Sequence, residues 1–419
     1  MNNVSFKKGF FIVIMIVMFV GLGVIPSTGN NISNKSTLPI IISGNILYVG
    51  GSGEGNYTKI MDAIKDASDG DTVFVYDDSS PYYERVSIFK RINLIGEDKN
   101  TTIIDTEHKS TTVTINADNC LVSGFTIRNC ERSGNEFEEA VVKIHNRYNV
   151  TINDNIITIG DIAHNDWTSA VMLHNSRHCT IKNNLIFETK HQGCTMGVVL
   201  LDGSSYNTIS GNEISRYIIG ISSSYTNLDY KNSNNIILGN HIHDNYWGIS
   251  FRYDDNYNKI LNNTIEFNEI HGIEIEYGHY NTISGNIISN NGEGHKFYSG
   301  IMITMYSSNN YISDNVISNN NPTGLYMLTS VNNVVTKNNF IDNWGKSGTR
   351  EKWWGDVFFN YEKSQWKLFR LNCWSRNYWK GHSGNLPKAI HGDMETFFFF
   401  FPRIEFDWLP AKESYDIGV

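Results

Sequence analysis

The sequence predicts an all-β solenoid, because one short phrase recurs along most of the chain. NTISGNEIS at 207–215 returns as NTISGNIIS at 281–289, and related phrases start at residues 150, 179, 235, 258, 310 and 333. The sixth place of every copy is asparagine, and successive copies of it lie 23 to 29 residues apart. A short period with variable insertions indicates stacked copies of one structural unit. These marker asparagines are Asn155, Asn184, Asn212, Asn240, Asn263, Asn286, Asn315 and Asn338.

Each unit contains short segments in which apolar and polar residues alternate. Segments such as GISFR (248–252) and GIEIE (272–276) form the first strand of a turn, the phrase forms the second, and a segment such as NIIS forms the third. Alternation with a period of two predicts strands with one buried face. Strands this short can bury that face only by stacking on neighbouring turns. The marker asparagines are predicted to turn inward at a corner and to hydrogen-bond one another as a ladder.

A solenoid needs a cover at its first turn, and the sequence predicts a helix for this role within residues 56–71. The apolar residues of this stretch fall on one helical face: Ile60, Ala63, Ile64 and Ala67. Thr58 is a candidate N-cap and Gly70 a candidate helix stop. We expect the apolar face to plug the end of the core.

The other end of the repeat is followed by an aromatic-rich region. Seven of the nine tryptophans lie beyond residue 343, and FFFFF occupies 397–401. We expect residues 344–419 to form a C-terminal cap, since an uncovered core would expose a large apolar patch. Contact of these aromatic residues with sugar or lipid is the alternative.

The N-terminus predicts export from the cytoplasm. Lys7 and Lys8 precede an uncharged, mostly apolar run from Gly9 to Ile25. This is the pattern of a signal peptide, or of an uncleaved signal anchor, over residues 1–26. Residues 27–44 then form a linker, and residues 45–343 the solenoid. An N-terminal anchor is the one membrane contact that this organisation predicts.

Net charge and cysteine spacing argue against a nucleic-acid-binding protein and against a metal site built from cysteines. The 419 residues carry a net charge of −9, which gives no electrostatic support for nucleic-acid binding. The five cysteines follow no metal-binding spacing and are expected to be buried thiols. Cys120 and Cys179 share one place in the repeat, but two turns separate them, too far for a disulfide.

Three stretches resemble a known family: residues 47–105, RNYWKG at 376–381 and FDWLPAKESYDI at 406–417. With the turns between them, they resemble pectin-lyase-like right-handed parallel β-helix proteins of the NosD and CASH (carbohydrate-binding and sugar-hydrolase) type. Exported archaeal proteins of this type are the most similar. The resemblance implies a single-stranded right-handed parallel β-helix, but this fold carries lyases, hydrolases, epimerases and adhesins alike. Relatives tend to have Asp after NYW, where this chain has Lys380, so no role of that Asp is transferred.

Aligning the first strand of each turn gives two outward columns. One column contains Lys143, Met172, Val199, Ser222, Ser250, Glu274, Met302 and Tyr326. The other contains His145, His174, Leu201, Ser224, Arg252, Glu276, Thr304 and Leu328. Most of these residues are ordinary for a solvent-exposed face. Two groups among them could carry chemistry.

Arg252, Glu274 and Glu276 form the first group and are the candidate catalytic residues. Paired carboxyl groups can cleave a glycosidic bond, one as acid and the other as base or nucleophile. Mutual repulsion should raise the pKa of one carboxyl group while Arg252 keeps the other ionised. Aromatic residues expected nearby can stack on sugar rings. The candidate substrate-binding residues are Trp247, Tyr253, Tyr277 and Tyr280. A solvated cross-strand ion pair is the alternative.

His145, His174 and Met172 form the second group. The two histidines should stack one turn apart, close enough to share a metal, and methionine is a soft ligand that suits copper. The resemblance to NosD proteins makes copper the natural candidate. The alternative is that these are ordinary surface histidines.

The sequence therefore leaves three functions open. The first is an exported β-helix protein that binds surface or environmental carbohydrate, such as a polysaccharide, with processing of it as an extension. The second is a structural or adhesion protein of the cell surface without an active site. The third is a NosD-like copper-handling protein. Catalysis, a required cofactor and the oligomeric state are not determined by the sequence.

Overall fold

A computed structural model describes residues 44–130, 139–160, 168–189, 195–224, 229–293, 297–343, 357–362, 372–395 and 400–417. Within them, the side chains of residues 360–362, 392–395 and 400–403 are not described. The predicted leader, Cys194, and the tryptophans at 344, 353, 354 and 366 lie outside these ranges. The described residues belong to one compact unit. None of the helices in these ranges is long and apolar enough to span a bilayer.

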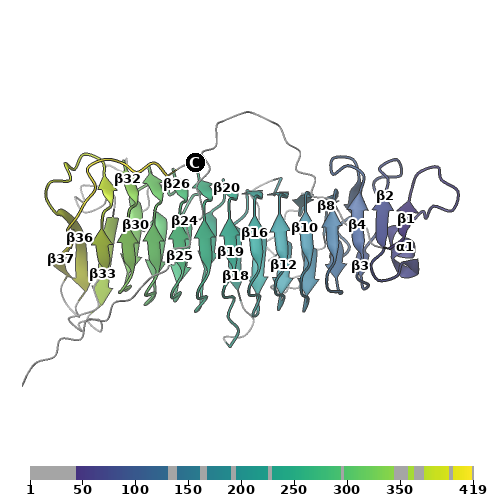
Figure 1. Ribbon diagram of the computed structural model, residues 1–419, viewed down its shortest axis with the longest axis horizontal. Coiled ribbons are helices and arrows are strands. Elements are labelled where there is room, and N and C mark those ends of the chain that lie inside the picture. The colour runs from purple at the N-terminus through teal and green to yellow at the C-terminus, as the bar shows by residue number, and fades with distance from the viewer. Residues whose placement is uncertain are drawn as a thin grey trace, which may run out of the picture. The chain divides into compact units, whose positions relative to one another are not determined.

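Successive turns contribute one strand to each of three parallel sheets, as the alternation predicts. Figure 1 shows the strands side by side, from β1 to β37. The first, sheet A, contains β1 (Ile46–Val49), β2 (Thr72–Val75), β4 (Asn93–Gly96), β7 (Leu121–Ser123), β10 (Thr151–Asn153), β13 (Thr180–Lys182), β16 (Thr208–Ser210), β19 (Ile236–Leu238), β22 (Lys259–Leu261), β25 (Thr282–Ser284), β28 (Tyr311–Ser313), β31 (Val334–Thr336) and β34 (Cys373–Ser375).

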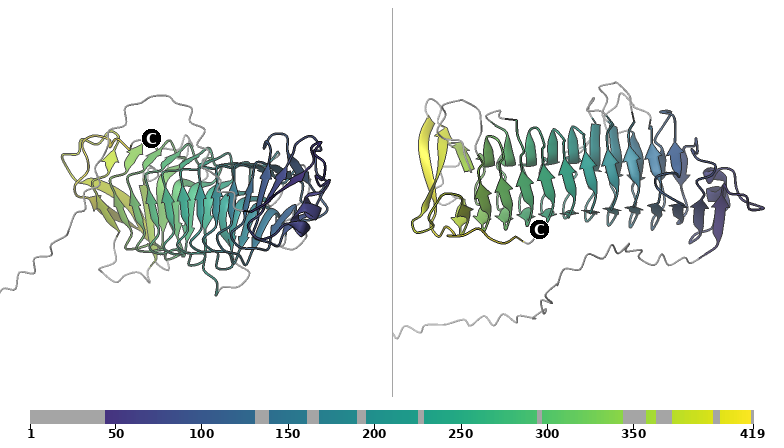
Figure 2. Two further views of the ribbon diagram at one scale, coloured as in Figure 1. Left: turned by 45° about the vertical axis from the view of Figure 1, so that its right-hand side comes forward. Right: turned by 90° about the horizontal axis from the view of Figure 1, so that it is seen from above.

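The other two sheets stack in the same order, and both views of Figure 2 show their strands in rows. Sheet B contains β5 (Ile103–Asp105), β8 (Thr126–Arg128), β11 (Ile156–Thr158), β14 (Leu185–Phe187), β17 (Glu213–Ser215), β20 (His241–His243), β23 (Thr264–Glu266), β26 (Ile287–Ser289), β29 (Val316–Ser318), β32 (Asn339–Ile341) and β35 (Tyr378–Trp379). Sheet C contains β3 (Val86–Ile88), β6 (Val113–Ile115), β9 (Ala140–His145), β12 (Thr168–His174), β15 (Thr195–Leu201), β18 (Ile219–Ser224), β21 (Trp247–Phe251), β24 (His271–Glu276), β27 (Ser299–Thr304), β30 (Thr323–Leu328), β33 (Val357–Glu362), β36 (Lys388–Glu395) and β37 (Phe400–Asp407). The predicted parallel β-helix is confirmed. Strands β36 and β37, at its C-terminal end, pair with each other in the antiparallel direction.

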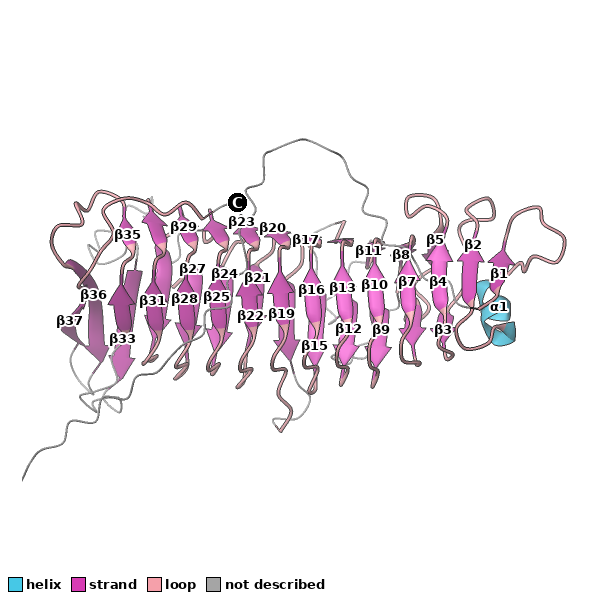
Figure 3. Ribbon diagram, in the orientation of Figure 1, coloured by secondary structure: helices cyan, strands magenta, loops and turns pink. Residues whose placement is uncertain are grey.

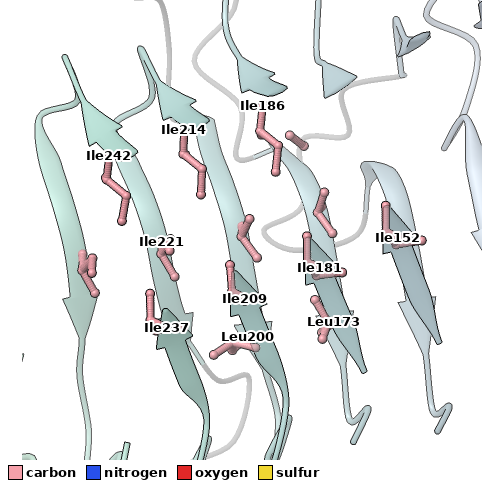
Figure 4. Packing of buried hydrophobic residues seen from close by; sticks show 14 of the residues in the cluster. Ile152, Leu173, Ile181, Ile186, Leu200, Ile209, Ile214, Ile221, Ile237 and Ile242 are labelled. Atoms are coloured by element: carbon pink, nitrogen blue, oxygen red, sulfur yellow. The ribbon is translucent and has the colours of Figure 1, made fainter. Parts of the chain in front are cut away.

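The core consists of apolar side chains stacked in register, and in the middle turns most of them are isoleucine. Ile152 pairs with Ile181, and Ile181 with Ile209, along sheet A. Figure 4 shows these isoleucines facing those of sheet B, among them Ile186 and Ile214. All five are fully buried. Burying an isoleucine stabilises the fold by roughly 1.5–3 kcal/mol, so each turn depends on its neighbours for most of its stability.

The predicted asparagine ladder is confirmed. At each step the backbone N–H and side-chain amide of one marker donate to the side-chain oxygen of the next, as Asn240 does to Asn263 at 2.9 Å for both bonds. Two further ladders, which the sequence analysis did not identify, run along the other corners. One contains Asn207, Asn235, Asn258, Asn281, Asn310, Asn333 and Asn372, and the other Asn245, Asn268, Asn291, Asn320 and Asn343.

A helix covers the first turns, but its caps differ from the prediction. Helix α1 (Ile60–Asp66) contacts β1, β2 and β3 and buries the expected apolar face; Figure 3 shows it beside β1. Thr58 is not the N-cap: that position is Lys59, and the carboxylate of Glu84 accepts the N–H groups of Ile60 and Met61 at 2.9 and 3.0 Å. An acidic side chain from the next turn satisfies the helix start in its place. The helix ends at Asp66, so Gly70 is not its stop either.

Strand β37 closes the other end through buried polar groups. Asp407 Oδ2 accepts hydrogen bonds from the backbone and side-chain nitrogens of Asn377 at 3.0 and 3.1 Å, which ends the marker ladder. The same oxygen accepts the indole N–H of Trp379 at 3.1 Å, and Glu405 accepts that of Trp374. Trp374 and Trp379 are buried, whereas Trp408 is exposed.

Candidate functional site

The candidate catalytic residues lie on the outer face of sheet C, where β21 and β24 pair. Ser250 is the register partner of Glu274. Alternation along the strands turns Ile249, Ile273 and Ile275 into the core, where they are fully buried. The polar residues between them consequently project from the opposite face.

Close approach of these two strands requires glycine at one place. A Cβ atom on Gly248 would lie 2.5 Å from the carbonyl oxygen of Gly272, and one on Gly272 would lie 2.6 Å from that of Gly300. Such distances are well inside van der Waals contact, so no larger residue fits without a backbone shift. The glycines therefore set the position of the strands that carry the site.

Arg252 joins the two carboxyl groups, as the predicted columns require. It donates hydrogen bonds from Nε and Nη2 to Oε2 of Glu274 at 3.0 and 2.8 Å. The hydroxyl group of Ser250 donates to the same oxygen at 2.6 Å. Arg252 Nε also lies 3.5 Å from Oε2 of Glu276. One guanidinium group thus contacts both carboxyl groups, and Glu274 is the more tightly held.

The surroundings shift the pKa values of the two carboxyl groups in opposite directions. Burial acts to raise the pKa of Glu274, but the charge of Arg252, the neighbouring His271 and the hydrogen bonds from Ser250 and Arg252 together hold it below its usual range. Burial raises the pKa of Glu276. The charge of Arg252 opposes this increase only in part, and the charge of Glu274 raises the pKa further. Opposed shifts in adjacent carboxyl groups favour distinct acid and base roles.

His271 is a residue of this site that the sequence analysis missed. It starts β24, is buried, and accepts the backbone N–H of Ser299 at Nδ1 at 3.1 Å. Burial lowers its pKa to about 4, so the ring is neutral near pH 7 with its proton on Nε2. His271 pairs with Trp247 in a third column, one residue before the glycines, which the two aligned columns did not include.

The four predicted aromatic residues lie at both ends of these strands. The ring of Trp247 is 5.8 Å from the Arg252 guanidinium carbon, a cation–π contact at the start of β21. Tyr253 and Tyr277 directly follow Arg252 and Glu276 in the chain. Tyr280 is three residues further on, before sheet A. The structure therefore brings Trp247 to Arg252 and places the tyrosines in the following turns.

The second predicted group does not form a ligand set that fits copper. The rings of His145 and His174 are stacked with centroids 4.7 Å apart, as the register predicts, but His174 Nε2 lies 3.2 Å from Asp202 Oδ2. Burial lowers the pKa of both histidines. In the part of the chain that the structure describes, no group of three or more His, Cys, Asp or Glu side chains could hold a metal.

Met172 was expected to project outward and to be accessible to solvent, but it is buried. It projects from sheet C but is fully buried in a second hydrophobic cluster outside the core. That cluster contains Ala140, Met172, Met196, Val199, Leu201 and Ile219. The alternation correctly predicted that the Met172 side chain projects outward from sheet C. It wrongly predicted that the side chain is exposed, because these outward apolar side chains pack against one another.

Comparison with known proteins identifies the family. The family model "Periplasmic copper-binding protein (NosD)" matches residues 64–233 and 221–380. The chain belongs to the NosD family. A comparison with curated proteins gave no match. The description of the NosD family places its members in the periplasm.

Solved structures similar to this NosD-family chain share its fold at low identity. PfbA, a surface adhesin of Streptococcus pneumoniae, is 14% identical with a TM-score of 0.55, over 84% of this chain and 95% of PfbA. XylC, solved with xylose, is 11% identical with a TM-score of 0.54, over 86% of this chain and 89% of XylC. The catalytic domain of a GH87 α-1,3-glucanase, solved with tetrasaccharides, is 14% identical with a TM-score of 0.55, over 83% of this chain and 66% of that domain. At such identities the likeness establishes the fold alone.

Proposed function

We propose that this NosD-family protein acts outside the cytoplasm, binds carbohydrate on the outer face of sheet C, and cleaves it through Arg252, Glu274 and Glu276. The observation that carries the proposal is the opposed pKa shift of two carboxyl groups that share one guanidinium group. That pattern suits an acid beside a carboxylate that stays ionised. The sugars recorded with XylC and with the glucanase show that this fold can present such ligands.

Each residue has a distinct role in this proposal. Glu276, with its raised pKa, donates a proton to the leaving oxygen of the glycosidic bond. Glu274, held ionised by Arg252 and Ser250, stabilises positive charge that develops on the sugar ring or activates water. Arg252 is the positioning residue, because it contacts both carboxyl groups. His271, buried on the same strand, contributes to lowering the pKa of Glu274.

A structural or adhesive role is the second candidate, and one observation favours it. PfbA, a surface adhesin, has the same fold, and 95% of its length overlaps with this chain. In that role Arg252 and the two glutamates would be a cross-strand ion-pair cluster on a half-buried face. The protein would then be retained by a surface ligand without changing it.

The experiment that tests the proposal measures retention and cleavage separately. The full chain is incubated with neutral and acidic polysaccharides, and both retention on the polymer and new reducing ends are recorded. We expect retention by at least one polymer and cleavage that Glu276→Gln abolishes. Glu266→Gln is the matched control, because Glu266 lies on sheet B and pairs with His241 at 3.1 Å. Retention without new chain ends would favour the adhesive role, and no retention by any polymer would contradict carbohydrate binding.

A further inference from the structure

We propose that six tyrosines in the turns from sheet C to sheet A form a binding strip for an extended, uncharged polysaccharide. This tyrosine strip comprises Tyr206, Tyr253, Tyr257, Tyr277, Tyr280 and Tyr306. The inference rests on the proposed carbohydrate function, but it does not require the carboxyl groups to be catalytic. It names the class of ligand and extends the site along the solenoid.

Five of the six tyrosines, all except Tyr306, occupy backbone positions that other turns give to asparagine. Each has a positive φ, between 53° and 68°. The backbone N–H of Tyr253 and of Tyr277 bonds the next turn just as that of Asn146 and Asn175 does earlier in the chain. Asn149 and Asn234 likewise hold the position that Tyr257 holds in its own turn. The fold therefore has a recurring left-handed place, and asparagine is its ordinary occupant.

Tyrosine at such a place is unfavourable for folding. A left-handed conformation brings Cβ close to the following carbonyl oxygen, and asparagine tolerates this far better than a bulky residue. Burial of the ring could offset that strain, but these side chains remain 36–52% exposed. Burial in the core therefore does not explain why tyrosine stands there. Strain kept at exposed side chains points to function.

The rings are held in a fixed arrangement before any ligand binds. Tyr257 and Tyr280 are stacked with centroids 5.1 Å apart and planes 5° from parallel. Tyr277 and Tyr306 lie 6.5 Å apart in the next pair of turns, and Tyr206 stacks on His178 at 5.4 Å. Because turns repeat every ~4.8 Å, the strip follows the direction in which the turns stack. Ordered rings reduce the entropy that binding costs.

The chemistry of the strip fits a neutral glycan. Phenol rings offer an apolar surface to the C–H face of a sugar and a hydroxyl group to its rim. The charges beside the strip are already paired: Asp254 with Lys231 at 2.7 Å and with His279 at 3.7 Å, and Arg252 with Glu274. The strip therefore offers no surplus positive charge for a polyuronate. Tyr253 and Tyr277 follow Arg252 and Glu276, so a chain lying on the strip passes the end of the carboxylate site.

The test uses the residue that the fold prefers at these positions. Tyr257→Asn combined with Tyr280→Asn in the full chain should leave the melting temperature unchanged or raise it. The retardation of each variant is measured by affinity electrophoresis in gels that contain soluble xylan, soluble glucan or polygalacturonate. We expect the wild-type chain to be retarded by a neutral polymer, and the double variant to bind that polymer at least tenfold more weakly. Tyr148→Asn is the matched control, since Tyr148 is exposed in an earlier turn and lies outside the strip.

Each other outcome overturns a defined part of the account. Equal retardation of wild-type chain and double variant by a neutral polymer would overturn the strip and leave the carbohydrate function standing. Retardation by polygalacturonate alone would overturn the neutral class of ligand. A lower melting temperature of the double variant would overturn the strain argument. Absence of retardation of the wild-type chain by any polymer would overturn the proposed function itself.

Discussion

At the scale of single residues, burial and neighbouring groups decide which acids keep their protons. Glu274 and Glu276 are close in sequence and share a face, yet the pKa of the first is lowered and that of the second raised. Asp255, in the turn after the neighbouring strand β21, is almost fully buried. Burial raises its pKa to about 7, against which the hydrogen bonds from Ser223 and Asn232 act only in part. One short region therefore holds three carboxyl groups whose pKa values are shifted in different directions or to different extents.

Asp255→Asn should stabilise the protein near neutral pH. The carboxyl group has a pKa of 3.8 when unfolded and about 7 when folded. Below pH 3.8 both states are protonated, so the group has no effect. As pH rises from 3.8 to about 7, the unfolded state loses the proton first, and the stability of the wild-type protein falls by a few kcal/mol. The variant removes this loss.

Chemical unfolding of the wild-type protein and the variant at pH 3.5 and pH 7.5 measures this effect. We expect similar free energies of unfolding at the lower pH and a more stable variant at the higher pH. Asp254→Asn is the control, because Asp254 is only partly buried and pairs with Lys231 at 2.7 Å. A variant without any gain at pH 7.5 would show that Asp255 is ionised in the folded state at no cost.

At the scale of elements, the asparagine ladders hold the corners between strands. Asn263 Oδ1 accepts two hydrogen bonds from Asn240, and its amide donates to the carbonyl of Ile237 at 2.9 Å and to Asn286 at 3.0 Å. Every group involved is buried. A gap in a ladder therefore leaves polar groups of two neighbouring turns without partners.

Asn263→Ala should destabilise the protein by about 3–5 kcal/mol, because buried donors and acceptors lose their partners. The free energy of unfolding from urea titration measures the loss. Asn262→Gly is the matched control: Asn262 is the preceding asparagine, with φ 53°, and lies outside the ladder. Losses of similar size in both variants would mean that the ladder contributes nothing specific.

Much of this element-scale structure could be predicted from sequence, for definable reasons. The markers fix the register, so the strand pairing and the columns that join Arg252 to Glu274 and Glu276 follow from spacing alone. The other two ladders could also have been predicted, because their asparagines stand at a constant spacing, five residues before and five residues after the markers. They were missed because only the marker position was assigned to a corner. The predicted N-cap of the helix was wrong because Glu84, from another turn, accepts the N–H groups that a local capping side chain would otherwise accept. His271 was missed because its column precedes the glycines, where the alternation is interrupted.

At the scale of the whole molecule, stability depends on how a repeating core is terminated. Every internal ladder step is satisfied by the next turn, so the last one needs a different partner. Asp407 is that partner for the marker ladder, and it also accepts the indole N–H of Trp379. The aromatic-rich composition predicted a cap in general terms. The buried carboxyl groups at its centre could not be predicted, because they depend on an antiparallel strand that breaks the repeat.

Asp407→Ala should therefore open the C-terminal end. Four donors, two on Asn377 and one each on Trp379 and Leu409, would lose their carboxylate acceptor. We therefore expect a loss of about 3 kcal/mol or more and exposed apolar surface. Thermal unfolding and light scattering after size-exclusion chromatography measure both effects. Glu413→Ala is the control, since Glu413 is exposed in the same region. A monomeric Asp407→Ala variant of unchanged stability would contradict this role for the cap.

The most direct test of the central claim is the titration of the two glutamates in the intact protein. Carbon-13 NMR of labelled side-chain carboxyl groups, assigned with Glu274→Gln and Glu276→Gln, follows each group with pH. We predict that Glu274 titrates below the ordinary value of 4.5 and Glu276 above it. In Arg252→Gln the pKa of Glu274 should rise. Both groups titrating together near 4.5 in the wild-type protein would contradict an acid and a base at this site, and leave an ion-pair cluster on a surface protein.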